Sequence, residues 1–403
     1  MTTTHHSPAS RRALLGAAAA GTALAAVGLP AGRATAAGAS TPASAPGSPA
    51  ALPPLNPAAL RAAIGDLEHP PATAAQLQVS GSAGRWYGTS GVADLRSGRP
   101  VRAGDKVRIG SITKMFVATV ALQLVAERRV CLDTPVRRCL PGLLPAGYGT
   151  ITLAHLLSHS SGLPNERGVP ARDTPEKVFA HRFDQWTPEQ LVALVTDGGR
   201  ELKFAPGTKQ EYRGINYVLA ALVIQELTGR PYGEEIAHRI LRPLGLCDTS
   251  VPGDERRIHG PRVHGYLRMS DGGLRDITEI NPSGSWGEGE MISTTDDLTR
   301  FTHALFSGAL LPPHVLRVMF TMPPDDVRMV DGGPARYSTG LQTVTVNGIT
   351  FWGKTGEQYG YASFAFATRD QRRCMVMSFN PTQRDRSQEQ MSLRVANAAT
   401  GGA

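Results

Sequence analysis

The spacing of apolar residues predicts strands at both ends of the chain and helices in its middle. Alternating apolar positions between Gln76 and Val92, broken by glycine, predict a hairpin. Four apolar runs near the C-terminus predict successive antiparallel strands: Gly340–Val346, Ile349–Trp352, Ser363–Ala367 and Cys374–Phe379. We therefore expect an α+β fold, in which an antiparallel sheet is flanked by helices and an all-α domain is inserted.

The predicted helices carry apolar residues three and four positions apart. They cover about residues 55–67, 111–127, 188–195, 217–227, 296–305 and 386–400. Thr187 and Thr294 precede two of them, and a threonine hydroxyl can cap the free N–H groups of a first turn. The sheet part is expected in about residues 55–110 and 325–403, and the helical part in about 111–324.

The N-terminus has the pattern of an export signal. Arg11 and Arg12 form a twin-arginine pair, a weakly apolar segment follows, and Ala34-Thr35-Ala36 supplies the small residues of a cleavage site. Residues 1–36 therefore predict secretion through the twin-arginine pathway. No retained membrane anchor is expected, because the apolar segment is short and only weakly apolar. Residues 37–54, rich in Ala, Ser, Pro and Gly, predict a linker before the folded domain at 55–403.

The charge and the cysteine content of the chain indicate no nucleic-acid partner and no zinc site. Residues 1–36 hold three arginines and no acid, so the rest of the chain has 39 basic against 34 acidic residues. No basic stripe or nucleic-acid motif accompanies this mild excess, and no nucleic-acid partner is expected. Cys131 and Cys139 could pair in an oxidising compartment. No cysteine pair has a zinc-binding spacing, and the sequence predicts neither a metal nor a cofactor.

The chemistry is indicated first by Ser111-Ile112-Thr113-Lys114, which opens a long apolar run. Residues three apart share one face of a helix, so a helix that starts near Ser111 brings its hydroxyl next to the Lys114 amine. A serine becomes a good nucleophile when a base takes its proton, and burial can lower the pKa of a lysine enough for that task. Ser111 is therefore the candidate nucleophile and Lys114 the candidate base.

Two further segments strengthen this interpretation. Tyr212 lies in a polar segment, and Lys354-Thr355-Gly356 follows an apolar run that predicts a buried strand. Ser-x-x-Lys together with Lys-Thr-Gly is a recognised catalytic combination. Lys354 offers a cation to a substrate carboxylate, Thr355 offers a hydroxyl donor, and Gly356 lets a substrate backbone lie flat against the strand.

With these motifs the chain resembles the serine penicillin-recognising enzymes, closest to the branch of class C β-lactamases and D-alanyl-D-alanine carboxypeptidases. The resemblance covers roughly residues 57–400. It includes the segments 108–116, 156–163, 204–208, 243–246, 292–298 and 356–360. It implies an α/β domain and an all-α domain with the active site between them. The motifs are specific for the fold and the nucleophile, but the family includes peptidases, β-lactamases, esterases, amidases and acyltransferases.

The resemblance also implies roles. Tyr212 is expected to relay a proton to the leaving group and later to activate the deacylating water. Two nearby ammonium groups, those of Lys114 and Lys354, are expected to lower its pKa. The oxyanion hole is expected to pair the backbone N–H of Ser111 with that of Glu357, so that neither side chain is needed for it.

One position departs from the family pattern. Where the family has Tyr-x-Asn, this chain has Tyr212-Arg213-Gly214. The asparagine amide normally contacts the catalytic lysine and the substrate, and glycine supplies neither contact. Arg213 or Asn216 could compensate, although Asn216 matches a structural asparagine of the family better. Efficient β-lactam hydrolysis is therefore in doubt, and the opened space would suit a bulkier acyl group.

Several other polar and aromatic residues have a structural interpretation. His155 and His159 lie four apart but lack the glutamate of a His-Glu-x-x-His site. Glu288 and Glu290 flank a glycine where the family usually has small residues. A carboxylate in the cleft is one interpretation, and a solvated loop is the favoured one. Trp286 and Tyr359 could line the cleft or pack in the core, with nothing in the sequence to decide between the two.

The sequence therefore predicts an exported serine hydrolase with an acyl-serine intermediate. The leading candidate is a D-alanyl-D-alanine carboxypeptidase-like peptidase that acts on peptidoglycan stem peptides and is inhibited by β-lactams. An esterase or D-amino-acid amidase is the alternative that Gly214 favours. A cyclising acyltransferase of nonribosomal peptides and a penicillin-binding sensor without turnover are further candidates. Export argues against the first of these, and the intact catalytic residues argue against the second.

Overall fold

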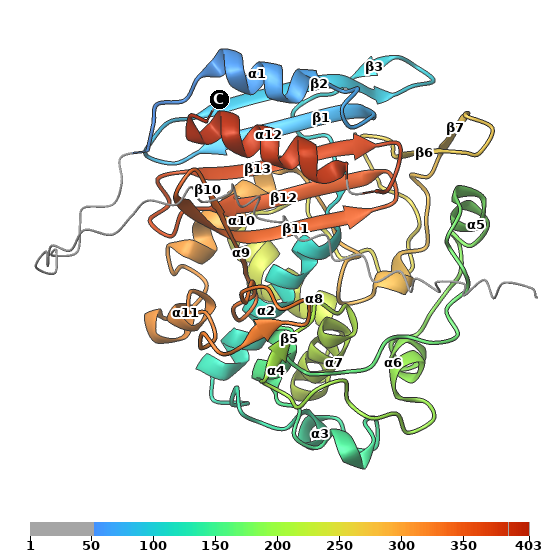
Figure 1. Cartoon of the computed structure of the whole chain (residues 1–403), viewed down its shortest axis with the longest axis vertical. Helices are drawn as coiled ribbons and strands as arrows, with labels where there is room; N and C mark the ends of the chain where they lie inside the picture. Colours follow the sequence, from blue (N-terminus) through green and yellow to red (C-terminus); the bar gives the residue numbers. More distant parts are fainter. Residues whose placement is uncertain (1–51, 386, 403) are drawn as a thin grey trace, which may run out of the picture.

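Strands from the two ends of the chain form one antiparallel sheet. The structure, a computed structural model, describes residues 52–385 and 387–402, so the predicted export signal lies outside the described residues. The sheet has seven strands in the order β10-β11-β12-β13-β1-β2-β3 (Figure 1). Antiparallel pairing of β1 with β13 joins the N-terminal strands to the C-terminal ones. The α+β fold expected from the sequence is confirmed.

The strands follow the predicted pattern closely. They are β1 (Ala72–Ser80), β2 (Trp86–Asp94), β3 (Arg99–Pro100), β10 (Gln342–Val346), β11 (Ile349–Gln358), β12 (Tyr361–Ala367) and β13 (Cys374–Pro381). Three short ladders pair β4 (Val107–Arg108) with β8 (Ile292–Ser293), β5 (Lys209–Gln210) with β9 (Arg328–Met329), and β6 (Tyr266–Arg268) with β7 (Leu274–Asp276). These ladders were not predicted, because strands of two or three residues leave no alternating pattern. Strand β11 continues past its predicted end at Trp352, so it includes Lys354-Thr355-Gly356.

The longer helices also lie where they were predicted. The helices are α1 (Pro57–Gly65), α2 (Thr113–Ala126), α3 (Val136–Cys139), α4 (Leu153–Leu157), α5 (Pro175–Ala180), α6 (Pro188–Thr196), α7 (Ile215–Thr228), α8 (Tyr232–Ile236), α9 (Arg242–Leu244), α10 (Thr295–Phe306), α11 (Pro313–Met319) and α12 (Gln388–Thr400). Short turns of other helix types are η1 (Gly110–Ile112), η2 (Ala146–Tyr148), η3 (Ala237–Leu241) and η4 (Pro282–Ser285). The expected caps are present: Thr187 caps α6 in a capping box with Gln190, and Thr294 caps α10.

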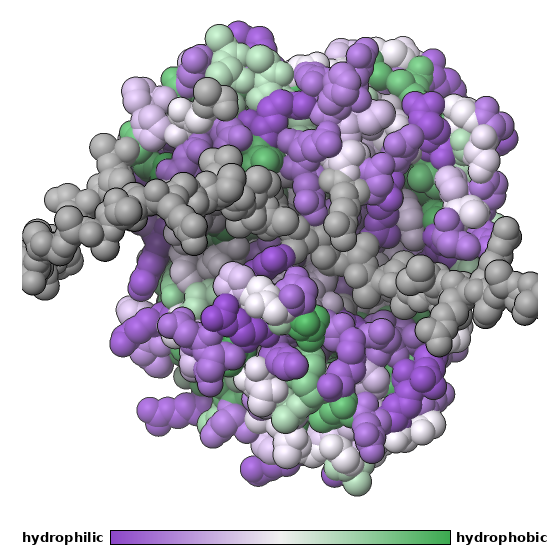
Figure 2. Space-filling view, viewed as in Figure 1, coloured by the Kyte–Doolittle hydropathy of each residue, from purple (hydrophilic) through white to green (hydrophobic). Residues whose placement is uncertain are grey.

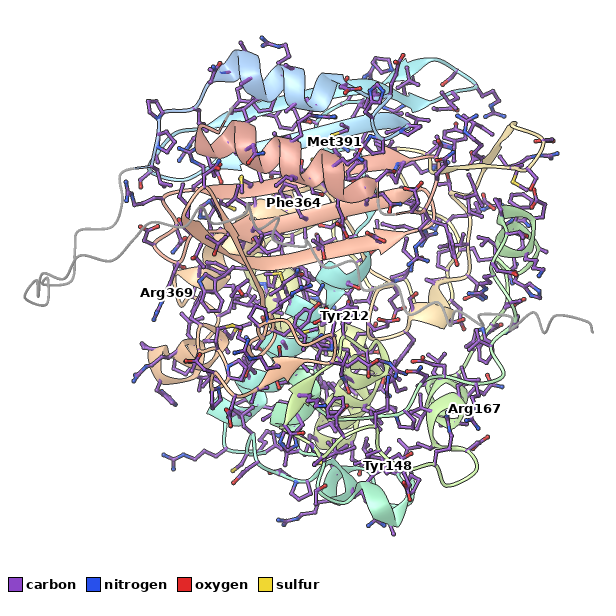
Figure 3. The ribbon with its side chains drawn as sticks, viewed as in Figure 1. Tyr148, Arg167, Tyr212, Phe364, Arg369 and Met391 are labelled. Atoms are coloured by element: carbon purple, nitrogen blue, oxygen red, sulfur yellow. The ribbon has the colours of Figure 1, made fainter. Side chains whose placement is uncertain are left out.

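Two apolar clusters cover the two faces of the sheet. On one face, α1 and α12 pack on the strands through Leu60, Met377 and their neighbours. Met391 of α12 and Phe364 of β12, both labelled in Figure 3, belong to this cluster. On the other face, sheet residues share a cluster with the helices of the lower half of Figure 1, including α2 and α7. The helical region therefore shares its core with the sheet, and a separate all-α domain stays a prediction.

The face drawn in Figure 2 is mostly hydrophilic, and the cysteines are unpaired. Hydrophilic residues predominate on the face drawn in Figure 2, and hydrophobic residues occur there in small separate spots. Among the described residues, no helix has the length and apolar character needed to cross a membrane. Cys131, Cys139, Cys247 and Cys374 are all free thiols. The pairing of Cys131 with Cys139 that the sequence left open is therefore not formed.

Candidate active site

A tight turn presents Ser111 to the sheet. Ser111 lies in η1, which leads directly into the buried helix α2, and Gly110 before it has a φ of +51°. A Cβ on Gly110 would lie 2.4 Å from the backbone nitrogen of Glu357, and a Cβ on Gly356 would lie 1.9 Å from the carbonyl oxygen of Ile109. Glycine at both positions is therefore what lets the backbone of β11 contact the turn that carries Ser111.

This close approach forms the wall expected of an oxyanion hole. The site of a Cβ on Gly356 lies 3.0 Å from the backbone nitrogen of Ser111, so the Ser111 and Glu357 amides are neighbours. Backbone N–H groups fixed beside a nucleophile stabilise the charge of a tetrahedral intermediate without rearranging. The Glu357 side chain points elsewhere and lies 3.7 Å from Arg384. The structure thus brings together the two amides that the resemblance implied.

Ser111, Lys114 and Tyr212 meet at one point. Lys114 Nζ lies 3.1 Å from Ser111 Oγ, and the Tyr212 hydroxyl donates to the same oxygen at 2.7 Å. Lys114 is fully buried on α2, whereas Ser111 is only half-buried and so remains reachable. Figure 3 shows Tyr212 between the sheet and the helices. The geometry needed for proton transfer from the hydroxyl to the amine is present without rearrangement.

Lys354 lies against the Tyr212 ring. Its Nζ is 4.5 Å from the centre of the Tyr212 ring and 3.4 Å from the side-chain oxygens of Gln342 and Thr355. Among the described residues no carboxylate forms an ion pair with it. Burial, with the nearby charge of Lys114, lowers the pKa of Lys354 to about 7. Lys354, Thr355 and Gly356 therefore line the site as predicted, but Lys354 is only partly charged at neutral pH.

The pKa of Tyr212 was predicted in the wrong direction. Burial raises this pKa above its ordinary value, and the negative charge of Glu288 raises it further. The expected lowering by two ammonium groups does not prevail, because loss of hydration penalises the phenolate more than the cations help it. Tyr212 is therefore a neutral phenol that donates a proton. Burial also lowers the pKa of Lys114, although the charge of Glu288 opposes this. Of the two groups, Lys114 is the better base.

Glu288 lies inside the site, which is the interpretation that the sequence favoured less. Its carboxylate Oε2 lies 2.5 Å from Lys114 Nζ, and its carbonyl oxygen accepts from the same ammonium at 2.7 Å. The expectation of a solvated loop is wrong, because this side chain is 26% exposed and paired inside the site. Glu290 is also not solvated. It is buried, accepts from Tyr232 and from the Gly287 amide, and burial raises its pKa to about 7.

The residues that could have replaced the missing asparagine do not enter the site. The Arg213 guanidinium turns away and donates to the carbonyl oxygens of Leu163 and Pro164. Asn216 accepts from Ser161 at 2.6 Å, as a structural asparagine would. A Cβ on Gly214 would instead meet the three atoms of the Glu288 carboxylate at 2.4 to 2.6 Å. The space left by the missing side chain is therefore occupied by Glu288.

The two histidines have structural roles. The His155 ring accepts from the Thr152 amide in the capping box of α4. His159 is buried against the Tyr212 ring, and burial with the charges of Lys114 and Lys354 holds its pKa well below the ordinary value. It is therefore neutral. In the described part of the chain no group of three or more His, Cys, Asp or Glu side chains could hold a metal ion.

Comparison with known proteins identifies the family. The family model described as Beta-lactamase matches residues 60–400. The chain belongs to this family. It is similar to a D-stereospecific amidohydrolase from Streptomyces sp., with 35% identity, a TM-score of 0.74, and coverage of 86% of this chain and 100% of that one. It is a member of a family of serine hydrolases with the β-lactamase and penicillin-binding-protein fold.

Two other relatives show how varied this family is. Penicillin-binding protein 4* of Bacillus subtilis is 25% identical over 77% of this chain and 68% of its own length. Esterase EstB of Burkholderia gladioli is 33% identical over 45% of this chain, and the match spans only 48% of the esterase. These relatives therefore leave the substrate open, and the catalytic roles of Ser111, Lys114 and Tyr212 stay predictions.

Proposed function

We propose that the protein is a serine amidohydrolase that cleaves amides of amino acids with a free α-amino group, with preference for the D-configuration. The observation that carries the proposal is the Glu288 carboxylate. It is separated from Ser111 Oγ by a single ammonium group, that of Lys114, and only its Oε2 is engaged there. An aminoacyl group on Ser111 carries its ammonium two bonds from the carbonyl carbon, within reach of the second carboxylate oxygen. The D-preference is supported by similarity to the Streptomyces amidohydrolase.

The site geometry suggests how each proton moves. Lys114 takes the proton of Ser111, and Ser111 Oγ attacks the amide carbon while the amides of Ser111 and Glu357 stabilise the oxyanion. Tyr212 gives its phenol proton to the leaving nitrogen as the C–N bond breaks, and Lys114 returns the serine proton to Tyr212. Water then attacks the acyl-serine and loses a proton to Lys114. Lys114 passes this proton to Ser111 Oγ as the ester bond breaks, which releases the acid and regenerates both Ser111 and the neutral amine.

Paired substrates test the preference. D-phenylalanine amide and phenylpropionamide differ only by the α-amino group, so their ratio of kcat/KM measures ammonium recognition. A charged hydrogen bond contributes roughly 1.5–3 kcal/mol, so this ratio should be on the order of tenfold to a hundredfold. Glu288→Gln should reduce the ratio to near one, and L-phenylalanine amide should be the poorer enantiomer. Equal rates for both amides with the wild-type protein would exclude the proposal.

The carboxypeptidase reading remains the second candidate. It is supported by similarity to penicillin-binding protein 4* and by Lys354, which is partly charged at neutral pH and lies 4.5 Å from the centre of the Tyr212 ring. A D-alanyl-D-alanine peptide with a blocked N-terminus has a terminal carboxylate but no ammonium. Faster release of D-alanine from this peptide than of ammonia from D-phenylalanine amide would favour the carboxypeptidase. Acylation by a fluorescent penicillin without hydrolysis would identify β-lactams as inhibitors.

Export rests on residues 1–36. Arg11 and Arg12 are the feature read by the twin-arginine receptor, and Ala34-Thr35-Ala36 offers the cleavage site. Arg11→Lys together with Arg12→Lys should therefore hold the protein in the cytoplasm. Mass spectrometry of secreted protein should find a mature N-terminus near Ala37. Unchanged secretion of the double variant would contradict the pathway, and an intact Met1 on active secreted protein would contradict the cleavage.

A further inference from the structure

Gly214 and Glu288 form a matched pair in the site. Gly214 has φ −61° and ψ −43°, which any residue adopts, so the backbone does not require glycine there. What requires glycine is space, because a Cβ would collide with the Glu288 carboxylate. Any side chain at position 214 would thus push this flexible carboxylate away from its present place.

That place is beside the candidate base. The Glu288 carboxylate and the Glu288 carbonyl both accept from Lys114 Nζ, so two groups of one residue fix the ammonium. The backbone of this loop is itself held: the Glu288 amide donates to Ser285, and Gln358 of β11 donates to the Ser285 hydroxyl. The loop that carries Glu288 is therefore tied to the strand that forms the oxyanion wall.

We propose that Glu288 is a positioning residue that replaces the missing side chain at position 214, holding the buried Lys114 amine beside Ser111. The pair Gly214 and Glu288 then acts as one unit. An asparagine restored at 214 displaces the carboxylate and harms the site unless Glu288 is shortened as well. The sequence predicted that Gly214 opens room for a bulkier acyl group, but the Glu288 carboxylate fills that space.

The charge of Glu288 has a second effect. It stabilises the protonated form of Lys114 and thereby raises the pKa of the base against the lowering caused by burial. Removing the charge lowers this pKa, so the neutral amine exists at lower pH and the acid limb of kcat/KM moves to lower pH. The other groups facing Lys114 are Tyr212 and Tyr217, His159, and Lys354 of β11. All of these are unchanged in the variants, so a shift between variants reports Glu288.

The test uses p-nitrophenyl acetate, which carries no amine. The inference rests on the serine–lysine chemistry of the proposed function but not on its preference for aminoacyl groups, so the two can fail separately. Glu288→Ala should lower kcat tenfold or more with little change in KM, and Glu288→Gln should lower it less. Both should move the acid limb to lower pH. Rates are expressed per active site counted with a fluorophosphonate, so misfolded protein does not enter them.

A double variant tests whether Gly214 and Glu288 act as one unit. Gly214→Asn alone should lower kcat by at least tenfold. The double variant Gly214→Asn with Glu288→Ala should have a kcat about tenfold higher than that of Gly214→Asn alone. If the double variant is no better than Gly214→Asn, the two residues do not act as a unit and the inference fails. An unchanged kcat and pH profile in Glu288→Ala would overturn it independently.

Discussion

The Tyr212 hydroxyl lies 2.7 Å from Ser111 Oγ, and the Lys114 amine lies 3.1 Å from the same oxygen. A serine hydroxyl with two such neighbours can lose its proton to one of them, while the other donates a proton to the leaving group. Because burial raises the pKa of the phenol and lowers that of the amine, their environments separate the two roles. We therefore expect Tyr212 to act as the acid and Lys114 as the base.

Ser111→Ala should abolish covalent labelling. The residue is half-buried, and in the described part of the chain its hydroxyl forms hydrogen bonds with Lys114 and Tyr212 only. The variant should therefore fold with an unchanged melting temperature while losing all labelling by a fluorophosphonate or a fluorescent penicillin. Gel fluorescence and peptide mapping measure this. A variant still labelled at another serine would contradict the mechanism.

Gly356→Ala should remove acylation. A methyl group at this position would meet the Ile109 carbonyl 1.9 Å away and force β11 from the turn that carries Ser111. The oxyanion amides would separate, and loss of one donor typically costs about a hundredfold to a thousandfold in rate. Gly65→Ala in α1 is the matched control, because nothing lies within 4 Å of its added methyl group. Normal burst kinetics in Gly356→Ala would contradict this prediction, because acylation would then proceed with strand β11 displaced.

Lys354 should make carboxylate substrates sensitive to pH. Its pKa of about 7 means that the cation is present below pH 7 and lost above it. The ratio of kcat/KM for a substrate ending in a carboxylate to that for its neutral amide should therefore fall as the pH rises from 6 to 8. Lys354→Ala should flatten this ratio across the range. A ratio that is independent of pH in the wild-type protein would restrict Lys354 to an electrostatic effect on Tyr212.

Arg213 should matter for stability more than for chemistry. Its side chain is 2% exposed and pairs with Glu166 at 2.8 Å, besides donating to two carbonyl oxygens. Arg213→Ala leaves two buried carbonyl oxygens unpaired, and each such loss costs about 1–3 kcal/mol. Thermal unfolding should show the loss, while folded protein at low temperature keeps its fluorophosphonate reactivity. Unchanged stability together with lost fluorophosphonate reactivity would contradict this prediction and would indicate a role for Arg213 in the active site.

The sequence predicted what depends on local spacing. Ser111 and Lys114 are three residues apart at the start of a helix, so their contact follows from one short segment. The place of Gly356 on a strand follows from the apolar pattern just before it. The contact of Glu288 with Lys114 spans 174 residues and depends on how an irregular loop closes, and no period in the sequence reports that. The pKa of Tyr212 was missed for a related reason, because its sign depends on a burial that only the packed structure reveals.

The pairing of β1 with β13 has a consequence for when activity can appear during synthesis. Ser111 and Lys114 belong to the first third of the chain, but the amide wall on β11 and the strands that hold it come from the last quarter. A growing polypeptide on the ribosome therefore holds Ser111 and Lys114 before the amide of Glu357 can join them. We expect acylation at Ser111 only after the C-terminal strands have been released and have closed the sheet.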